Sequence, residues 1–251
     1  MTVAPNARRL AVVPGLAAAG FVLLLAAPPS SAGPVVASGT AQASSTASAA
    51  FAPVVSQTTT DGRHFTPLSA SSSASSSSFF GQSRKSNNAS LSLTAPGPNI
   101  TQTLTGHADS TGNVFNNASA NGTSTLSGFF NTVGNYQYTL NATGSASASP
   151  FTNDTSAVSL SIPDAGLSDS ASSPFFGGTN SFSDTRSGAI GNGSHSFTAS
   201  ASNNTGFTNS AAALDFSLQL TPIPEPGTLA LLGPSLLLLG LGLLAAACIG
   251  W

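Results

Sequence analysis

The chain has 251 residues with six basic and eight acidic side chains, and its formal net charge is −2. So few Lys and Arg residues cannot form the basic face that nucleic-acid binding requires, and the low net charge excludes a disordered polyelectrolyte. The one cysteine, Cys248, has no partner for a disulfide in its own chain. We therefore expect no nucleic-acid partner and no disulfide framework.

The N-terminus has the pattern of an export signal. An arginine pair precedes an apolar stretch at 10–27, and Pro28 ends any helix there. Small residues before the junction predict cleavage between Ala32 and Gly33. We expect a signal peptide over residues 1–32 and export across the cytoplasmic membrane. Because the apolar stretch is long, an uncleaved anchor is the alternative.

Residues 33–78 form a segment of low complexity that is rich in Ser, Ala and Thr. Such a composition offers too little apolar surface to offset the entropy lost on ordering. The sequence around 51–55, with Phe and two Val, is the exception and predicts an edge strand. We expect the folded domain to begin at Phe79.

Residues 79–221 alternate between apolar and polar side chains, with no helical stripe. A period of two is typical of half-buried strands. The alternating sets are Leu91/Leu93, Ile100/Leu104, Tyr136/Tyr138/Leu140, Val158/Leu160/Ile162, Phe197/Ala199 and Leu214/Phe216/Leu218/Leu220. The fold class predicted is all-β, an antiparallel β-sandwich-like ectodomain, with a β-solenoid as the alternative.

Glycine and asparagine clusters predict the turns between these strands. They are Asn121-Gly122, Asn141–Gly144, Phe176–Asn180 and Gly191–Gly193. A weak echo also recurs in Phe79-Phe80-Gly81, Phe129-Phe130-Asn131 and Phe175-Phe176-Gly177, and again in Phe151-Thr152-Asn153 and Phe207-Thr208-Asn209. Because the strands hold few large residues, we expect a thin core and a domain that is either marginally stable or gains order from calcium, glycan or assembly.

No catalytic constellation is evident. The histidines, His64, His107 and His195, are far apart, and no Gly-x-Ser-x-Gly elbow is present. His107-Ala108-Asp109 would orient an imidazole, but serine is so common that a Ser/His/Asp set arises on paper by chance. The chain also lacks a Ca²⁺-loop motif, although six aspartates have turn-like contexts: Asp61, Asp109, Asp154, Asp164, Asp169 and Asp184. We expect no enzyme, no cofactor and no metal.

The C-terminus combines a stiff spacer with an apolar helix. Thr228–Trp251 has no charged side chain and ten leucines, which at about 1.5 Å per residue is long enough to span a bilayer. We therefore predict a single transmembrane helix and an anchor, at least transient, at residues 228–251. Prolines at alternate positions before it favour an extended spacer that presents Glu225, the one glutamate. On physical grounds alone, this carboxylate is either a recognition handle or an incidental part of a linker.

The block Pro224-Glu225-Pro226, followed by Gly227 and the Leu/Gly-rich helix, resembles the PEP-CTERM sorting signal of exported bacterial proteins. The resemblance covers residues 222–251. It implies recognition by an exosortase, a membrane-embedded peptidase that removes the tail and passes the protein to the cell surface or exopolysaccharide. The chain departs from the family pattern because no Arg or Lys follows the helix.

Together these features predict a non-enzymatic protein of the cell surface or exopolysaccharide matrix, with an exosortase-like peptidase, the membrane and exopolysaccharide as partners. One alternative is a lectin-like domain in which Tyr136, Tyr138 and the Phe pairs stack on sugar. The other is a eukaryotic glycolipid-anchored glycoprotein with an attachment site near Asn209–Ala212. Eight Asn-x-Ser/Thr sequons fit that reading: Asn88, Asn99, Asn117, Asn121, Asn141, Asn153, Asn192 and Asn203.

Overall fold

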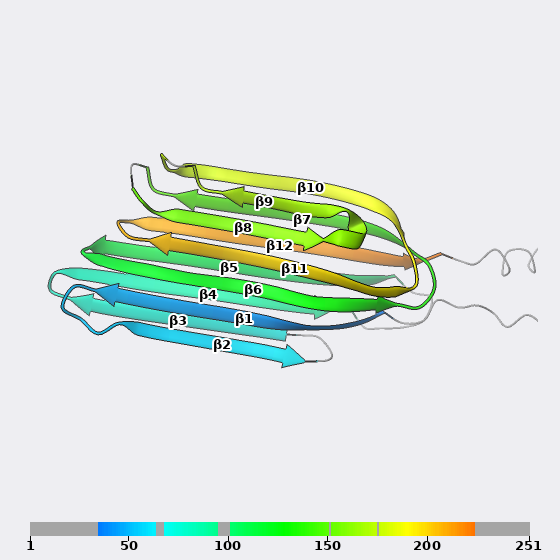
Figure 1. Cartoon of the computed structure of the whole chain (residues 1–251), viewed down its shortest axis with the longest axis horizontal. Helices are drawn as coiled ribbons and strands as arrows, with labels where there is room; N and C mark the ends of the chain where they lie inside the picture. Colours follow the sequence, from blue (N-terminus) through cyan, green and yellow to red (C-terminus); the bar gives the residue numbers. More distant parts are fainter. Residues whose placement is uncertain (1–34, 64–67, 95–100, 151, 175, 224–251) are drawn as a thin grey trace, which may run out of the picture. The chain divides into compact units, whose positions relative to one another are not determined.

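The computed structural model describes residues 35–63, 68–94, 101–150, 152–174 and 176–223. Twelve strands and one short 3₁₀ helix make up this part of the chain (Figure 1). In order they are β1 (Val36–Ala49), β2 (Val55–Arg63), β3 (Leu68–Ser78), β4 (Gly81–Leu93), β5 (Gln102–Asn116), β6 (Ala118–Thr132), β7 (Tyr136–Ala148), β8 (Thr155–Ile162), η1 (Pro163–Ala165), β9 (Leu167–Ser172), β10 (Gly178–Ile190), β11 (Gly193–Thr205) and β12 (Asn209–Pro222).

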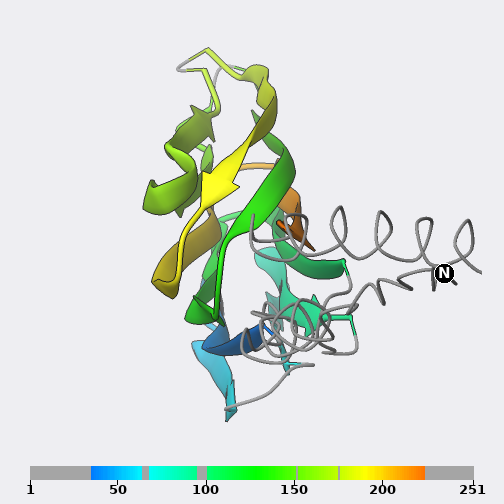
Figure 2. The same ribbon diagram turned by 90° about the vertical axis from the view of Figure 1, so that its right-hand side faces the viewer.

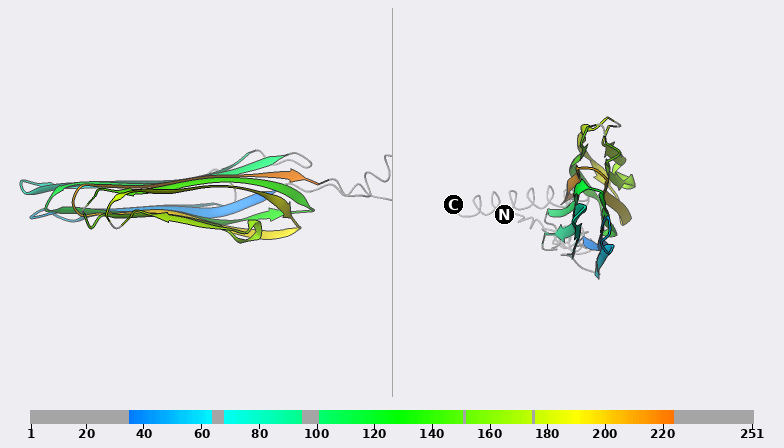
Figure 3. Two further views of the ribbon diagram at one scale, coloured as in Figure 1. Left: turned by 90° about the horizontal axis from the view of Figure 1, so that it is seen from above. Right: turned by 90° about the vertical axis from the view of Figure 1, so that its left-hand side faces the viewer.

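The strands form two six-stranded sheets that stack face to face (Figures 2 and 3). Sheet 1 has the order β2-β1-β6-β11-β8-β9, and sheet 2 has the order β10-β7-β12-β5-β4-β3. Every strand pairing is antiparallel. The prediction of an all-β antiparallel sandwich is therefore confirmed, and the solenoid alternative is wrong.

Both ends of the described chain lie at one end of the sandwich. Val36 pairs with Asn131 and Pro222 pairs with Tyr136, so the first and last strands flank the same turn between β6 and β7. The Ile223 N–H also donates to Asn135 O at 2.9 Å. We call this the proximal end. The opposite, distal end carries the turns β1–β2, β3–β4, β5–β6, β7–β8, β9–β10 and β11–β12 (Figure 1).

The proximal half of the interior is an apolar core. Alternation places one face of each strand between the sheets, which buries large side chains such as Leu91, Leu104, Tyr136, Phe197 and Phe216. These are the residues that the period of two singled out, and their burial confirms the strand predictions. Ile100 lies outside the described residues.

The distal half of the interior is built from small and polar side chains. Along β4 the inward series runs from Leu91 through Asn87 and Lys85 to Ser83, and on β5 it runs from Leu104 to Ser110. The core is therefore thin at one end only, and short side chains that hydrogen-bond across the sheets replace apolar packing there.

The Ser/Ala/Thr-rich segment is part of the sandwich, contrary to the expectation that order begins at Phe79. β1 lies between β2 and β6. β3 pairs with β4, and the turn that joins them contains residue 79, the expected start of the domain. Alanine fills inward positions such as Ala41, Ala43 and Ala74. Backbone pairing on both sides and close packing of small side chains stabilise a segment whose composition alone predicts little order.

Two of the predicted turns are wrong. Asn121-Gly122 lies inside β6, and Asn141–Gly144 lies inside β7. These strand positions require glycine because neighbouring side chains occupy the space that a Cβ would take. At Gly144 the neighbouring side chain is that of Phe182. The turn at Gly191–Gly193 is confirmed, and Gly177 turns with φ of 80° just before β10.

Several predictions fall outside the described residues. They are the signal peptide, the cleavage site at Ala32 and Gly33, the motif Pro224, Glu225 and Pro226, and the helix at 228–251. In the portion of the chain that the structure describes, no helix has the length and apolar character needed to cross a membrane.

Candidate functional site

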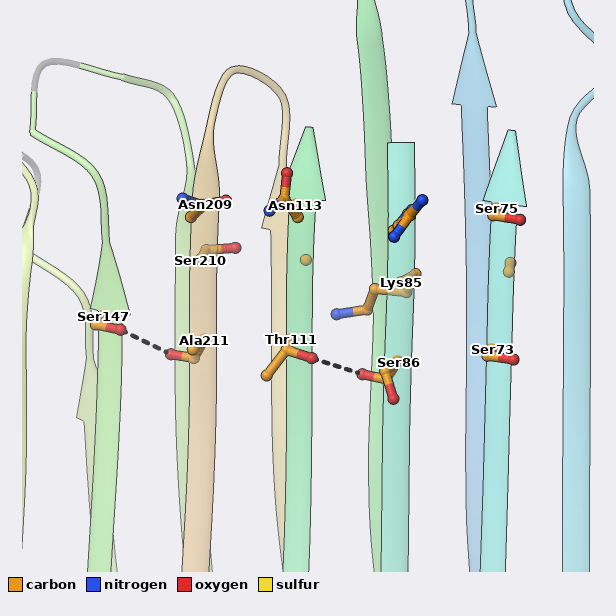
Figure 4. A pocket seen from close by; sticks show the side chains of 13 residues that line it. Ser73, Ser75, Lys85, Ser86, Thr111, Asn113, Ser147, Asn209, Ser210 and Ala211 are labelled. Carbon is orange, nitrogen blue, oxygen red and sulfur yellow. Dashed lines mark hydrogen bonds between the residues drawn. The ribbon is translucent and has the colours of Figure 1, made fainter. Parts of the chain in front are cut away.

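The outer face of sheet 2 carries a shallow groove near its distal end (Figure 4). The groove has a volume of about 720 Å³ and crosses β3, β4, β5, β12 and β7. Its outward-facing lining is mostly hydroxyl and amide groups, with one charged side chain and one alanine: Ser73, Ser75, Arg84, Ser86, Thr111, Asn113, Ser147, Asn209 and Ala211.

Strand register fixes the order of these groups across the groove. Arg84 lies beside Asn113 in the β4–β5 pair, and Ser86 lies beside Thr111. The Thr111 hydroxyl donates to Ser86 O at 3.5 Å, which leaves its side chain on the exposed face (Figure 4). Every lining residue is on a strand, so the sheet backbone fixes the spacing of the hydrogen-bond donors and acceptors in rows. Such rows match the repeated hydroxyl groups of an extended polymer.

Beneath the groove, a buried polar cluster joins the two sheets. Lys85 Nζ donates to Ser110 Oγ at 2.7 Å, and Ser110 donates in turn to Asn87 Oδ1 at 2.6 Å. Asn87 Nδ2 donates to Ser45 Oγ at 2.6 Å, and Ser45 bonds to Ser72 at 2.8 Å. The cluster thus runs from sheet 2 to β1 of sheet 1 and back to β3.

Lys85, the one lysine of the chain, is only 2% exposed. Burial lowers its pKa from 10.5 to about 7, and the Asp109 carboxylate on the neighbouring strand opposes that shift. Gly122 makes room for this side chain, since a Cβ there would collide with Lys85 Cε and Asn87 Nδ2. The glycine that composition predicts to turn the chain instead accommodates the lysine.

A second recess of about 500 Å³ on the same face contains His107. His107 Nδ1 lies 2.6 Å from Asp215 Oδ1, and its Nε2 lies 3.7 Å from Asp109 Oδ1. His107 on β5 pairs with Ser90 of β4 on one side and with Asp215 of β12 on the other. The three residues therefore form a Ser/His/Asp row across the sheet. The imidazole, however, directs Nε2 toward Asp109, and no hydrogen bond joins it to Ser90. The row therefore does not form a charge-relay triad.

The other histidine and aspartates described make structural contacts. His195 Nδ1 lies 3.0 Å from Asp164 Oδ2. Asp154 accepts the backbone N–H groups of residues 206–208 at 2.7–3.2 Å. Asp184 accepts from Arg186 Nε at 2.6 Å, which lowers the Asp184 pKa. Within the described ranges no group of three or more His, Cys, Asp or Glu is placed to hold a metal. His64 lies outside them.

The tyrosines proposed for sugar stacking are not available for it. Tyr136 is fully buried, and Tyr138 is buried with its hydroxyl donating to Ala165 O at 3.1 Å. Among the Phe pairs, Phe79, Phe80, Phe129 and Phe176 are exposed, whereas Phe130 is buried. The Asn203 sequon is also inaccessible in the fold, because its amide is buried and donates to Ser110 O and Ser210 O.

No protein-family model, curated protein or solved structure matches the chain. The groove and the buried lysine were not found by sequence reasoning. Their signal was present in outward Ser, Thr and Asn positions of the strands and in a lone lysine among alternating small residues. Because serine is so frequent throughout the chain, the residues of the groove and of the buried cluster do not differ from their surroundings in composition.

Proposed function

We propose that the chain is an exported, non-enzymatic protein of the cell surface or exopolysaccharide matrix. The outer face of sheet 2 contacts polysaccharide. The tail at 222–251 sorts the protein through an exosortase-like peptidase that reads Pro224, Glu225 and Pro226. The observation that carries this proposal is the groove of hydroxyl and amide groups over β3, β4, β5, β12 and β7.

The chemistry of the groove suits sugar polymers. Ser, Thr and Asn side chains supply both donors and acceptors, and a single neutral hydrogen bond contributes about 0.5–1.5 kcal/mol. Arg84 adds the one cationic group, which pairs bidentately with a carboxylate of an acidic sugar. Affinity then accumulates over many weak contacts along the polymer.

The positions of the chain ends support the sorting half of the proposal. Residues 35 and 223 both leave the sandwich at its proximal end. The points at which the sandwich connects to the predicted export signal and to the sorting tail are therefore at the same end, and the groove lies toward the other end of the sandwich.

The test is binding of the exported protein to exopolysaccharide purified from its own host, measured by co-sedimentation. Replacing both groove side chains, in Arg84→Ala/Asn113→Ala, is expected to weaken binding at least tenfold, because two hydrogen-bonding groups are lost. Asn121→Ala is the matched control, since Asn121 is an exposed strand asparagine on sheet 1. Equal binding by all three proteins would contradict the proposed face.

A further inference from the structure

The outer face of sheet 1 carries a regular array of uncharged polar side chains. On its inner strands β1, β6 and β11, every second residue of 40–46, 121–127 and 198–204 points away from the core. These twelve positions hold Ser, Thr, Asn or Gln, and none is ionisable or aromatic. We call them the polar array. The outer face of sheet 2 differs, because it carries Arg84, His107 and Asp215.

Strand register aligns the array into rows. Ser44 of β1 pairs with Thr123 of β6, which pairs in turn with Ser202 of β11, and the other rows follow the same order. Neighbouring strands lie about 4.8 Å apart, and residues on one face of a strand repeat about every 6.8 Å. The polar array is therefore a lattice of three columns and four rows.

The lattice is held firmly. β1, β6 and β11 each pair with a strand on both sides, so no column lies at an edge of the sheet, and the strands run nearly straight (Figures 1 and 3). Ser44 Oγ lies 3.0 Å from Thr123 Oγ1, and Ser200 Oγ lies 2.8 Å from Ser159 Oγ of β8. Threonine is also stiff about χ1. The hydroxyl groups thus have well-defined positions before any ligand arrives.

The spacings of the lattice are close to those of the oxygen atoms in ice. With about 2.8 Å between hydrogen-bonded oxygens, tetrahedral geometry places next-nearest oxygens of ice about 4.6 Å apart and repeats its layers about every 7.5 Å. The strand spacing and the same-face repeat each agree with these values to within about a tenth. A hydroxyl group donates and accepts hydrogen bonds as water does. The array therefore offers both the spacing and the bonding of an ice plane.

We propose that the polar array binds the surface of ice crystals. The lack of charge favours this ligand, because an ionised side chain orders a hydration shell of its own that does not continue a crystal of water. A crystalline neutral polysaccharide is the weaker candidate, because it presents the faces of sugar rings as well as hydroxyl groups. The array has no aromatic side chain to stack on such rings. The groove proposed to bind polysaccharide is on the other sheet.

The test is partition of the chain, in the form its host releases, into ice that grows slowly from a stirred solution. Growing ice excludes ordinary solutes, so we expect enrichment of the wild type in the ice, while a non-binding protein stays in the liquid. Thr125→Lys places a cation near the centre of the array, and its enrichment should fall to the level of the excluded protein. Thr143→Lys is the matched control, because Thr143 is exposed on β7 in the outer face of sheet 2.

Thr123→Ala/Thr125→Ala separates a loss of binding from a loss of folding, because it removes two hydroxyl groups and adds neither bulk nor charge. Urea unfolding shows that each variant is folded, and the folded double variant should be less enriched than the wild type. A wild type that ice excludes overturns the proposal, as does a folded Thr125→Lys that is enriched like the wild type. A Thr143→Lys variant that loses enrichment equally also overturns it.

Crystalline cellulose provides the comparison with polysaccharide. Binding to cellulose that Thr125→Lys abolishes, without enrichment in ice, overturns the proposal and assigns the array to polysaccharide. Enrichment in ice with no binding to cellulose is the result we expect. Neither measurement uses the groove on sheet 2 or the sorting tail, so this test fails independently of the proposed function.

Discussion

Replacing the buried lysine should make the protein more stable. Lys85→Met removes an ammonium group that is 2% exposed and has one hydrogen-bond partner, Ser110 Oγ. Methionine is unbranched and of similar length, so it fills the space over Gly122. Ser110 keeps its bond to Asn87 Oδ1, whereas the Asp109 carboxylate loses the attraction of the ammonium group, which offsets part of the gain.

The magnitude follows from the pKa of Lys85, which burial lowers from 10.5 to about 7. The unfolded lysine keeps its proton up to pH 10.5, whereas the folded one loses it near pH 7. Between these values the unfolded state binds more protons, so the free energy of unfolding of the wild type rises with pH. At 1.36 kcal/mol per pKa unit, we expect a rise of about 2 kcal/mol from pH 7 to 9.

At pH 7 the lysine destabilises the fold by about 4 kcal/mol relative to a neutral group, and its hydrogen bond offsets about 1 kcal/mol. Lys85→Met should therefore gain about 3 kcal/mol at pH 7 and lose the pH dependence. Urea unfolding from pH 6.5 to 9.5 measures both, with Arg84→Met on the exposed side of the same strand as control. A wild type whose stability is flat over this range, together with a less stable Lys85→Met, would refute the reasoning.

Three further predictions concern the packing of a glycine, the hydrogen bonds of one turn and an ion pair on β10. Gly122→Ala should destabilise the fold by about 2 kcal/mol in urea unfolding, because the new Cβ collides with Lys85 Cε and strand backbone; a neutral effect would contradict the close approach. Asp154→Asn should cost about 2 kcal/mol and speed proteolysis at 206–208, because a charged acceptor of three amides is lost; unchanged proteolysis would count against that role. Arg186→Met should raise the Asp184 pKa measured by NMR, since the bond to the guanidinium lowers it. Stability from that bond is present above pH 3.8 and fades as pH falls through the folded pKa. An unshifted Asp184 would show that the bond is not formed.

Sequence patterns predicted the proximal half of the fold well and the distal half poorly. Strands with Leu, Phe or Tyr at every second position, such as residues 214–220, stand out by hydropathy. On β1 and β3 the inward residues are mostly Ala and Ser and the outward ones mostly Ser and Thr, so alternation carries almost no hydropathy signal. Pairing with β6 and β4, rather than local preference, orders these strands.

The candidate site was less predictable than the fold, for a related reason. Any strand of Ser, Thr and Asn presents hydroxyl and amide groups, and only the register of β4, β5 and β12 shows which of them share a face. Two Asn/Gly clusters also predicted turns where tertiary contacts of Lys85 and Phe182 require glycine within a strand. The polar array of sheet 1 likewise depends on register, which aligns outward residues of β1, β6 and β11 that are far apart in the sequence.

The most direct test of the central claim is the intact mass of the protein recovered from the surface and matrix fraction of its producing cells, with both terminal peptides sequenced. The proposed function predicts a chain that begins at Gly33 and ends between residues 222 and 228, with any excess mass reporting glycan or lipid. A chain that runs from Met1 to Trp251 and remains inside the cell would contradict export and sorting together.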